Sequence, residues 1–89
     1  MIKNKEQILD KLFNEFLDKD LRIILEGIIT SQFVVHNSKI LMNNKHLIIT
    51  DCENEEIIIS LNELLDVTIN EYFITFKIIN QIITIDMIW

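Results

Sequence analysis

The last third of the chain alternates apolar and polar residues, and this pattern constrains the fold more than any other feature. A two-residue turn at Asn80-Gln81 would place Phe76 opposite Ile85, and a preceding turn at Asn70-Glu71 would bury the same face of the shared middle strand. Successive side chains of a strand point to opposite faces, so a one-residue slip in either turn would destroy this agreement. The sequence therefore predicts a three-stranded antiparallel meander over about residues 64–89.

The N-terminal segment has helical periodicity instead. Its apolar residues form one stripe, namely Ile8, Leu9, Leu12, Phe13, Phe16 and Leu17, and its polar residues, including Lys11, take the other side. Asn4 is a candidate N-cap, with Gln7 three residues later. The pattern predicts an amphipathic helix over about residues 4–18.

The end of this helix has two interpretations. The apolar stripe continues toward Glu26, where Gly27 would make a left-handed C-cap, but the same residues also alternate as a strand. Neighbouring β-branched residues such as Ile23 and Ile24 crowd a helix. We therefore favour a helix that ends near Asp18 and a strand that begins near residue 21.

The central part of the chain contains short apolar runs separated by asparagine. Strands are expected at residues 33–36, 40–42, 46–50 and 56–60, with a short helical turn at 61–64. With one Gly and no Pro in the chain, Asn supplies the positive φ that turns need. The sequence predicts a single α+β domain over residues 1–89. Its N-terminal helix packs on a curled antiparallel sheet or small open barrel of about five to six strands, within a β region of about 21–89.

The charge of the chain is concentrated in one window. Residues 51–71 contain seven acids and no Lys or Arg, whereas the other seven acids are met by eight basic residues. The formal charge of −6 therefore arises in this window. Such a stretch repels nucleic-acid phosphates and anionic lipid and attracts basic surfaces, so we expect no direct nucleic-acid binding and no membrane association.

The sequence offers little for catalysis or for cofactor binding. The acidic run around Glu53 has oxygen ligands for a hard cation, but Glu56 stands where an EF-hand loop needs Gly. His36, His46 and Cys52 lack the short paired spacings of a zinc site. One Gly cannot build a phosphate-binding loop, and no serine has a nucleophile-elbow context. We expect no enzyme activity, no cofactor and no metal.

These features favour a non-enzymatic interaction protein. The expected partner-binding residues are Asp51, Glu53, Glu55, Glu56, Glu63, Asp66 and Glu71, which would dock on a basic surface of another protein. The sharpest form of this hypothesis is an inhibitor encoded by a phage or mobile element, directed at a nuclease or defence complex. Two alternatives stay open: a solubilising charge that guards a strand edge, and a small β-barrel regulatory subunit that binds a ligand or metal.

Two further expectations concern assembly and location. The second face of the meander carries apolar residues, Phe73, Ile79, Ile82 and Ile88, which one short helix cannot cover together with the core face. We therefore favour a homodimer. A single cysteine, no signal-like N-terminus and no membrane-spanning apolar run favour a cytoplasmic location.

Overall fold

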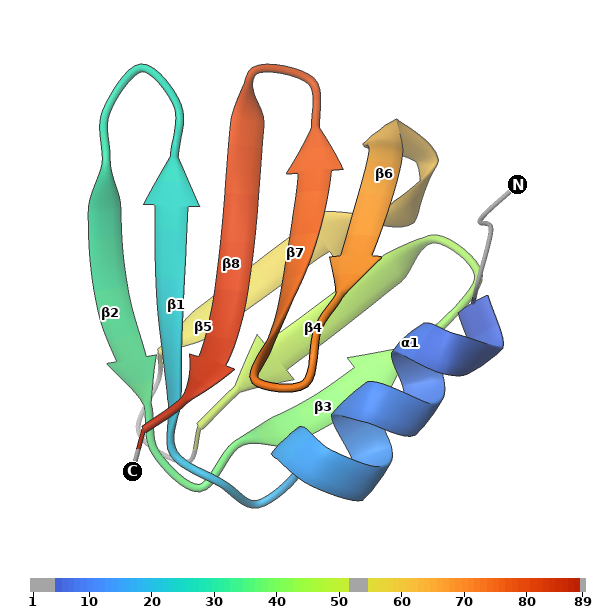
Figure 1. Ribbon diagram of the computed structural model, residues 1–89, viewed down its shortest axis with the longest axis vertical. Helices are drawn as coiled ribbons and strands as arrows, with labels where there is room; N and C mark the ends of the chain where they lie inside the picture. Colours follow the sequence, from blue (N-terminus) through green and yellow to red (C-terminus); the bar gives the residue numbers. More distant parts are fainter. Residues whose placement is uncertain (1–4, 52–54, 89) are drawn as a thin grey trace.

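The computed structural model describes residues 5–51 and 55–88 and confirms an α+β fold with one N-terminal helical segment (Figure 1). That segment comprises α1 (Lys5–Lys11) and the π-helical η1 (Leu12–Phe16). The strands are β1 (Leu21–Glu26), β2 (Ser31–Val35), β3 (Lys39–Met42), β4 (His46–Thr50), β5 (Glu56–Ser60), β6 (Leu64–Ile69), β7 (Phe73–Ile78) and β8 (Gln81–Met87), with the 3-10 turn η2 (Leu61–Glu63) before β6. The N-cap expected at Asn4 lies outside the described residues.

The strands form two antiparallel sheets. One sheet has the order β2-β1-β8-β7-β6, and the other has the order β3-β4-β5 (Figure 1). The described residues thus form eight strands, one at each segment where the sequence marks a strand, whereas the overall expectation of about five to six strands is close only to the size of the larger sheet. The chain changes sheet twice, between β2 and β3 and again at η2. The predicted meander is confirmed as β6-β7-β8, and β1 joins it by pairing with β8.

The helical segment ends at Phe16, close to the end near Asp18 that we favour from the sequence. The Leu17 N–H donates to the Leu12 carbonyl oxygen at 2.8 Å, an i to i+5 bond that widens the last turn. Asp18 then adopts a φ of 65°, which stops the helix before β1. Within the stripe, Ile8, Leu12 and Phe16 are fully buried, whereas Phe13 is 39% exposed. The buried stripe is therefore narrower than predicted.

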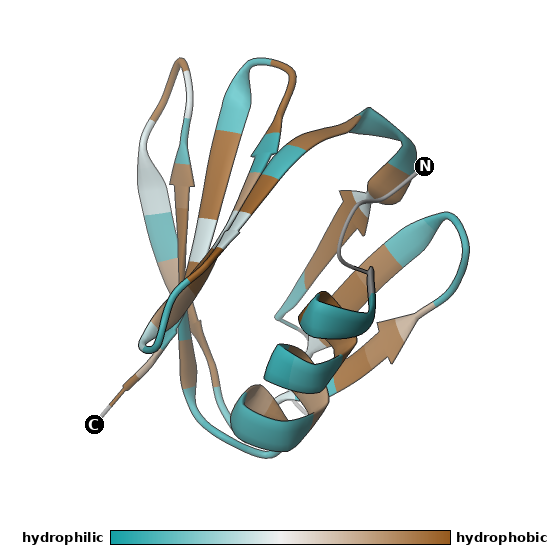
Figure 2. Ribbon diagram, turned by 45° about the vertical axis from the view of Figure 1, so that its right-hand side comes forward, coloured by the Kyte–Doolittle hydropathy of each residue, from teal (hydrophilic) through white to brown (hydrophobic). Residues whose placement is uncertain are grey.

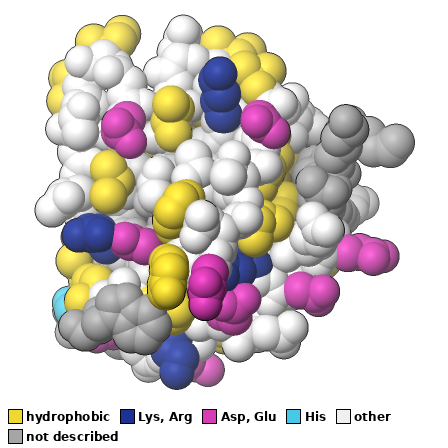
Figure 3. Space-filling view, in the orientation of Figure 1, with side chains coloured by type: hydrophobic (Ala, Val, Ile, Leu, Met, Phe, Trp, Pro, Cys, Tyr) yellow, Lys and Arg dark blue, Asp and Glu magenta, His cyan; other side chains and the backbone are white. Residues whose placement is uncertain are grey.

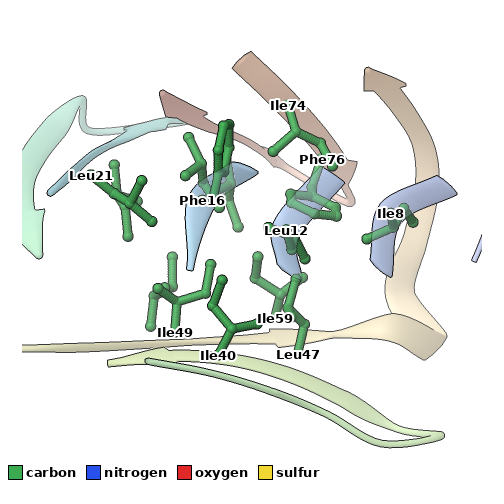
Figure 4. Close-up of a cluster of buried hydrophobic side chains, with 14 of the residues drawn as sticks. Ile8, Leu12, Phe16, Leu21, Ile40, Leu47, Ile49, Ile59, Ile74 and Phe76 are labelled. Atoms are coloured by element: carbon green, nitrogen blue, oxygen red, sulfur yellow. The ribbon is translucent and has the colours of Figure 1, made fainter. Parts of the chain in front are cut away.

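The core lies between the two sheets, and the helical segment inserts its apolar face into it (Figure 2). Leu12 and Phe16 lie between side chains of the two sheets (Figure 4). The five-stranded sheet contributes Leu21, Ile74 and Phe76, and the three-stranded sheet contributes Ile40, Leu47, Ile49 and Ile59. The outer face of the five-stranded sheet points away from the helix, so the helix does not cover it, and Ile82 and Ile88 stay exposed there.

Ser38 fixes the end of the helical segment to the β2–β3 connection. Its side chain is fully buried, and Oγ donates to the Phe16 carbonyl oxygen at 2.8 Å. Its backbone N–H donates to the Lys19 carbonyl at 3.0 Å, and its own carbonyl accepts from the Asp18 N–H at 2.9 Å. The first bond satisfies the Phe16 carbonyl, which the helix end leaves without an intrahelical donor, and the other two hold residues 18 and 19 against the β2–β3 connection.

The register within the meander differs from the prediction by two residues. Phe76 lies opposite Ile83 and Ile85 lies opposite Ile74, so the predicted pairing of Phe76 with Ile85 is wrong. The turn between β7 and β8 has Asn80 as its second residue, with a φ of 67°. This turn is thus one residue earlier than predicted, whereas the turn before β7 is one residue later than predicted.

A shift of two residues keeps side chains on their faces, so the predicted buried face is retained in β7 and β8 and at Val67 and Ile69. Leu65, which the predicted register places on this face opposite Phe76, is instead 62% exposed, because the register is irregular between Leu64 and Asp66.

Phe76 is fully buried at the centre of the core, and its truncation tests this packing. We expect Phe76→Ala to lower the free energy of unfolding by about 3–5 kcal/mol, because it leaves a cavity between the sheets. Leu65→Ala, at a 62% exposed position, is the control and should change stability by less than about 0.5 kcal/mol. Chemical denaturation measures both, and equal effects would contradict the observed core.

Candidate interaction surface

The acids of the 51–71 window are distributed over several elements. Asp51 follows β4, Glu55 and Glu56 lie at the start of β5, and Glu63 lies in η2. Asp66 lies in β6 and Glu71 in the β6–β7 turn, while Glu53 falls outside the described residues. All the described members except Asp51 are exposed.

Asp51 has a role inside its own loop. It is only 8% exposed, and its Oδ1 accepts a hydrogen bond from the Glu55 N–H at 3.1 Å. The backbone closes the same loop, because the Asp51 N–H donates to the Glu55 carbonyl at 3.1 Å. Thr50 Oγ1 also lies 3.1 Å from that carbonyl oxygen. The burial of Asp51 removes it from the exposed acidic surface that the sequence predicts.

The exposed acids do not gather into one patch. Glu56 begins β5 and Glu63 follows its end, and a five-residue strand is roughly 17 Å long. Asp66 lies on the other sheet, where its register partner is Lys77. On the face shown in Figure 3, acidic side chains are interspersed with basic and apolar ones. A stretch that is continuous in sequence is therefore split between two sheets, and Glu55 and Glu56 form its most compact described part, here called the acidic tip.

Four ion pairs join described residues to acids outside the window. Lys11 Nζ lies 2.9 Å from Glu15 Oε1, Arg22 pairs with Asp86, and Lys39 pairs with Asp18. His36 Nδ1 also lies 3.7 Å from Asp20 Oδ2. The hydrogen bond and charge of Asp86 raise the pKa of Arg22 above its usual value. Lys11, Arg22, His36 and Lys39 are thus paired with acids outside the window, and within the described residues the acidic tip has no ion-pair partner.

Lys11 is buried, although helical periodicity predicts an exposed position for it. The sequence assigns it to the polar side of the helix, but it is only 6% exposed. Its Nζ donates to the Glu71 carbonyl oxygen at 2.8 Å and lies 5.5 Å from the centre of the Phe16 ring. Lys11 therefore ties the helix to the β6–β7 turn. Helical periodicity contains no signal for this contact, because the carbonyl belongs to a distant turn.

A shallow groove between two hairpin tips is a second feature that sequence reasoning missed. It has a volume of about 360 Å³ and is lined by Glu26, Gly27, Lys77, Ile78, Asn80, Gln81 and Ile82. A Cβ on Gly27 would lie 2.8 Å from the Asn80 carbonyl oxygen, so glycine permits this close approach of the hairpins. Ile28 and Ile29, which are 99% and 77% exposed, follow Gly27 at the tip. Apolar side chains gather at this end in Figure 3.

Residues 5–51 and 55–88 contain neither a candidate metal site nor a helix long enough to span a membrane. No group of three His, Cys, Asp or Glu side chains there is placed to hold a metal ion. His36 and His46 are both exposed. His36 follows β2 of the five-stranded sheet, whereas His46 begins β4 of the three-stranded sheet. Among the same residues, helices are too short to traverse a lipid bilayer.

The role of Asp51 in its loop can be separated from any role in binding. We expect Asp51→Ala to lower the free energy of unfolding by about 1–3 kcal/mol, because the Glu55 N–H would lose its carboxylate acceptor. Glu55→Ala leaves that backbone group intact and should cost less than about 0.5 kcal/mol. Urea denaturation compares the two variants, and a neutral Asp51→Ala would contradict the structural role.

Comparisons with known proteins identified no relative of the chain. No family model, curated protein or solved structure matches the chain. The functional interpretation therefore rests on the geometry and charge described above.

Proposed function

We propose that the protein is a non-enzymatic interaction module whose acidic tip docks on a basic surface of a partner protein. The observation that carries this proposal is a difference in ion pairing. Glu55, Glu56, Glu63, Asp66 and Glu71 are exposed and form no ion pair with another described residue, whereas four of the seven acids outside the window, Glu15, Asp18, Asp20 and Asp86, each lie within ion-pair distance of a basic side chain. Unneutralised carboxylates on a chain with a net charge of −6 steer a basic partner toward the surface that carries them.

The acidic tip also stands on a rigid support. Strands β4 and β5 pair over their full length, from His46 opposite Ser60 to Thr50 opposite Glu56. The inner faces of both strands are buried in the core. A β-hairpin held in this way presents its carboxylates with little loss of conformational entropy on binding, which favours affinity.

The sharpest version of the proposal is an intracellular inhibitor of a nucleic-acid-handling protein, encoded by a phage or mobile element. Carboxylates spaced along a β-hairpin can occupy a basic groove that otherwise binds phosphates. The acidic window around β5 supports this version through its sign of charge and its exposure. A nuclease or defence complex is the partner of this kind that we propose.

A second candidate function is a regulatory subunit that binds a small ligand. The groove beside Gly27 favours it, since this groove combines apolar isoleucines with Glu26 and Lys77. The two functions respond differently to salt. Acidic docking weakens as ionic strength rises, whereas binding in an apolar groove changes little.

Charge reversal at the acidic tip tests the docking proposal. We expect the double variant Glu55→Lys and Glu56→Lys to retain its fold but to lose a partner that the wild-type protein captures from host extract, because the steering charge is inverted. The matched control is Glu6→Lys with Asp10→Lys, two exposed acids on α1 that give the same change in net charge.

Affinity capture followed by binding measurements at increasing salt provides the readout. The proposal expects loss of binding in the tip variant alone and a wild-type Kd that rises with salt. Equal loss in both variants would show that only net charge matters and would contradict a localised docking surface. Binding that is insensitive to salt and to both charge reversals would favour the groove instead.

A further inference from the structure

The two open sheets leave four edge strands, and three of them carry features that oppose pairing with another chain. Strand β5 begins with Glu56 after the acidic loop, and β6 contains Asp66 and a register irregularity between Leu64 and Asp66. Strand β3 has only four residues and begins with Lys39, which pairs with Asp18. Charges, bulges and short length are the usual protections of a sheet edge.

Strand β2 is the exception among these edges. Its sequence, Ser31–Val35, contains no charge, no glycine and no proline, and its pairing with β1 is regular over five residues. It stands at the end of the five-stranded sheet, and β1 is its only strand partner among the described residues. Unpaired backbone N–H and C=O groups along such an edge are a template for another strand.

The core is also incomplete at this edge. Phe33 points to the inner side of the sheet and packs against the core, yet it is only half-buried. Its register partner, Ile23, lies one strand further in and is fully buried. An aromatic ring at the margin of a core gains further burial if a strand is added beside it.

We propose that the protein forms a two-fold symmetric dimer in which β2 pairs antiparallel with β2 of a second copy. A two-fold axis beside Phe33 places the two Phe33 rings opposite each other and places Gln32 opposite Val34 of the second copy. No like charges then face each other across the strand pair, which makes the edge complementary to itself. The result is a continuous ten-stranded sheet, with each added strand covering the margin of the other core.

The exposed tip of the β1–β2 hairpin supports the same partner. Ile28 and Ile29 lie just before β2 and extend beyond the end of the sheet. In antiparallel pairing the tip of one copy lies beside the end of β2 in the other copy. The two-fold arrangement therefore shields part of the surface of two of the most exposed apolar side chains. This dimer does not depend on the proposed acidic docking, because the acidic tip lies on the other sheet.

Sedimentation equilibrium over micromolar concentrations tests the dimer. Wild-type protein should sediment at twice the mass of the chain, and the double variant Gln32→Lys with Val34→Lys should raise the dimer dissociation constant at least tenfold, since it sets lysines opposite each other. The matched control, Leu65→Lys with Thr68→Lys on the β6 edge, should stay dimeric.

A third variant separates edge pairing from stacking of sheet faces. Thr84→Arg places a large charged side chain in the middle of the outer face, where Thr84 Oγ1 lies 3.4 Å from Thr75 Oγ1. Edge pairing predicts that this variant stays dimeric. Dissociation by Thr84→Arg but not by the β2 lysines would overturn the proposal in favour of face stacking, and a monomeric wild-type protein would overturn it outright.

Two measurements on the unmodified protein keep the test independent of variant folding. Hydrogen exchange of β2 amides should accelerate on dilution while exchange in β7 stays unchanged, and equal behaviour of the two strands would contradict edge pairing. Salt should strengthen the dimer, because it screens repulsion between two copies that each carry a charge of −6. Acidic docking has the opposite salt dependence, so failure of one proposal is distinguishable from failure of the other.

Discussion

The packing of one short helical segment between two sheets is the constraint on which the rest of the structure depends. Neither sheet covers the core face of the other by itself, and Ile8, Leu12 and Phe16 fill the space between them. The position of the helix is set by buried hydrogen bonds at Ser38 and Lys11 in addition to apolar contact. Removal of these three apolar side chains would expose apolar surface on both sheets at once. The two sheets therefore share one cooperative core.

Local patterns in the sequence predict the elements well, because each element follows from its own periodicity and turn residues. Strands β4 and β5 have the predicted bounds, and the helix ends near Asp18 as favoured. Pairing is harder to predict, since a register shift of two residues preserves every buried face. Phe76 is on the buried face in either register, and in the observed register Asn80, with a φ of 67°, is the second residue of the turn. The division into two sheets also has no local signal, because it depends on where connections cross the core.

The acidic window shows how sequence proximity can mislead about a surface. Asp51 is used inside its loop, and Asp66 lies on a different sheet from Glu56. Strand alternation and the change of sheet at η2 separate residues that composition groups together. What persists in three dimensions is the exposure of Glu55, Glu56, Glu63, Asp66 and Glu71, which form no ion pair with another described residue, and this supports the proposed docking function. Lys11 is the converse case, because a residue that periodicity places in water contacts a carbonyl sixty residues away.

We infer that the helix joins both sheets into a single cooperative unit. Native-state hydrogen exchange on a Leu12→Ala variant tests this inference. Leu12 is fully buried between the sheets, so its truncation should weaken contacts to both. We expect amides of β4 and amides of β8 to lose protection by the same free energy, because both exchange through global unfolding. Loss of protection in one sheet, with the other unchanged, would contradict it.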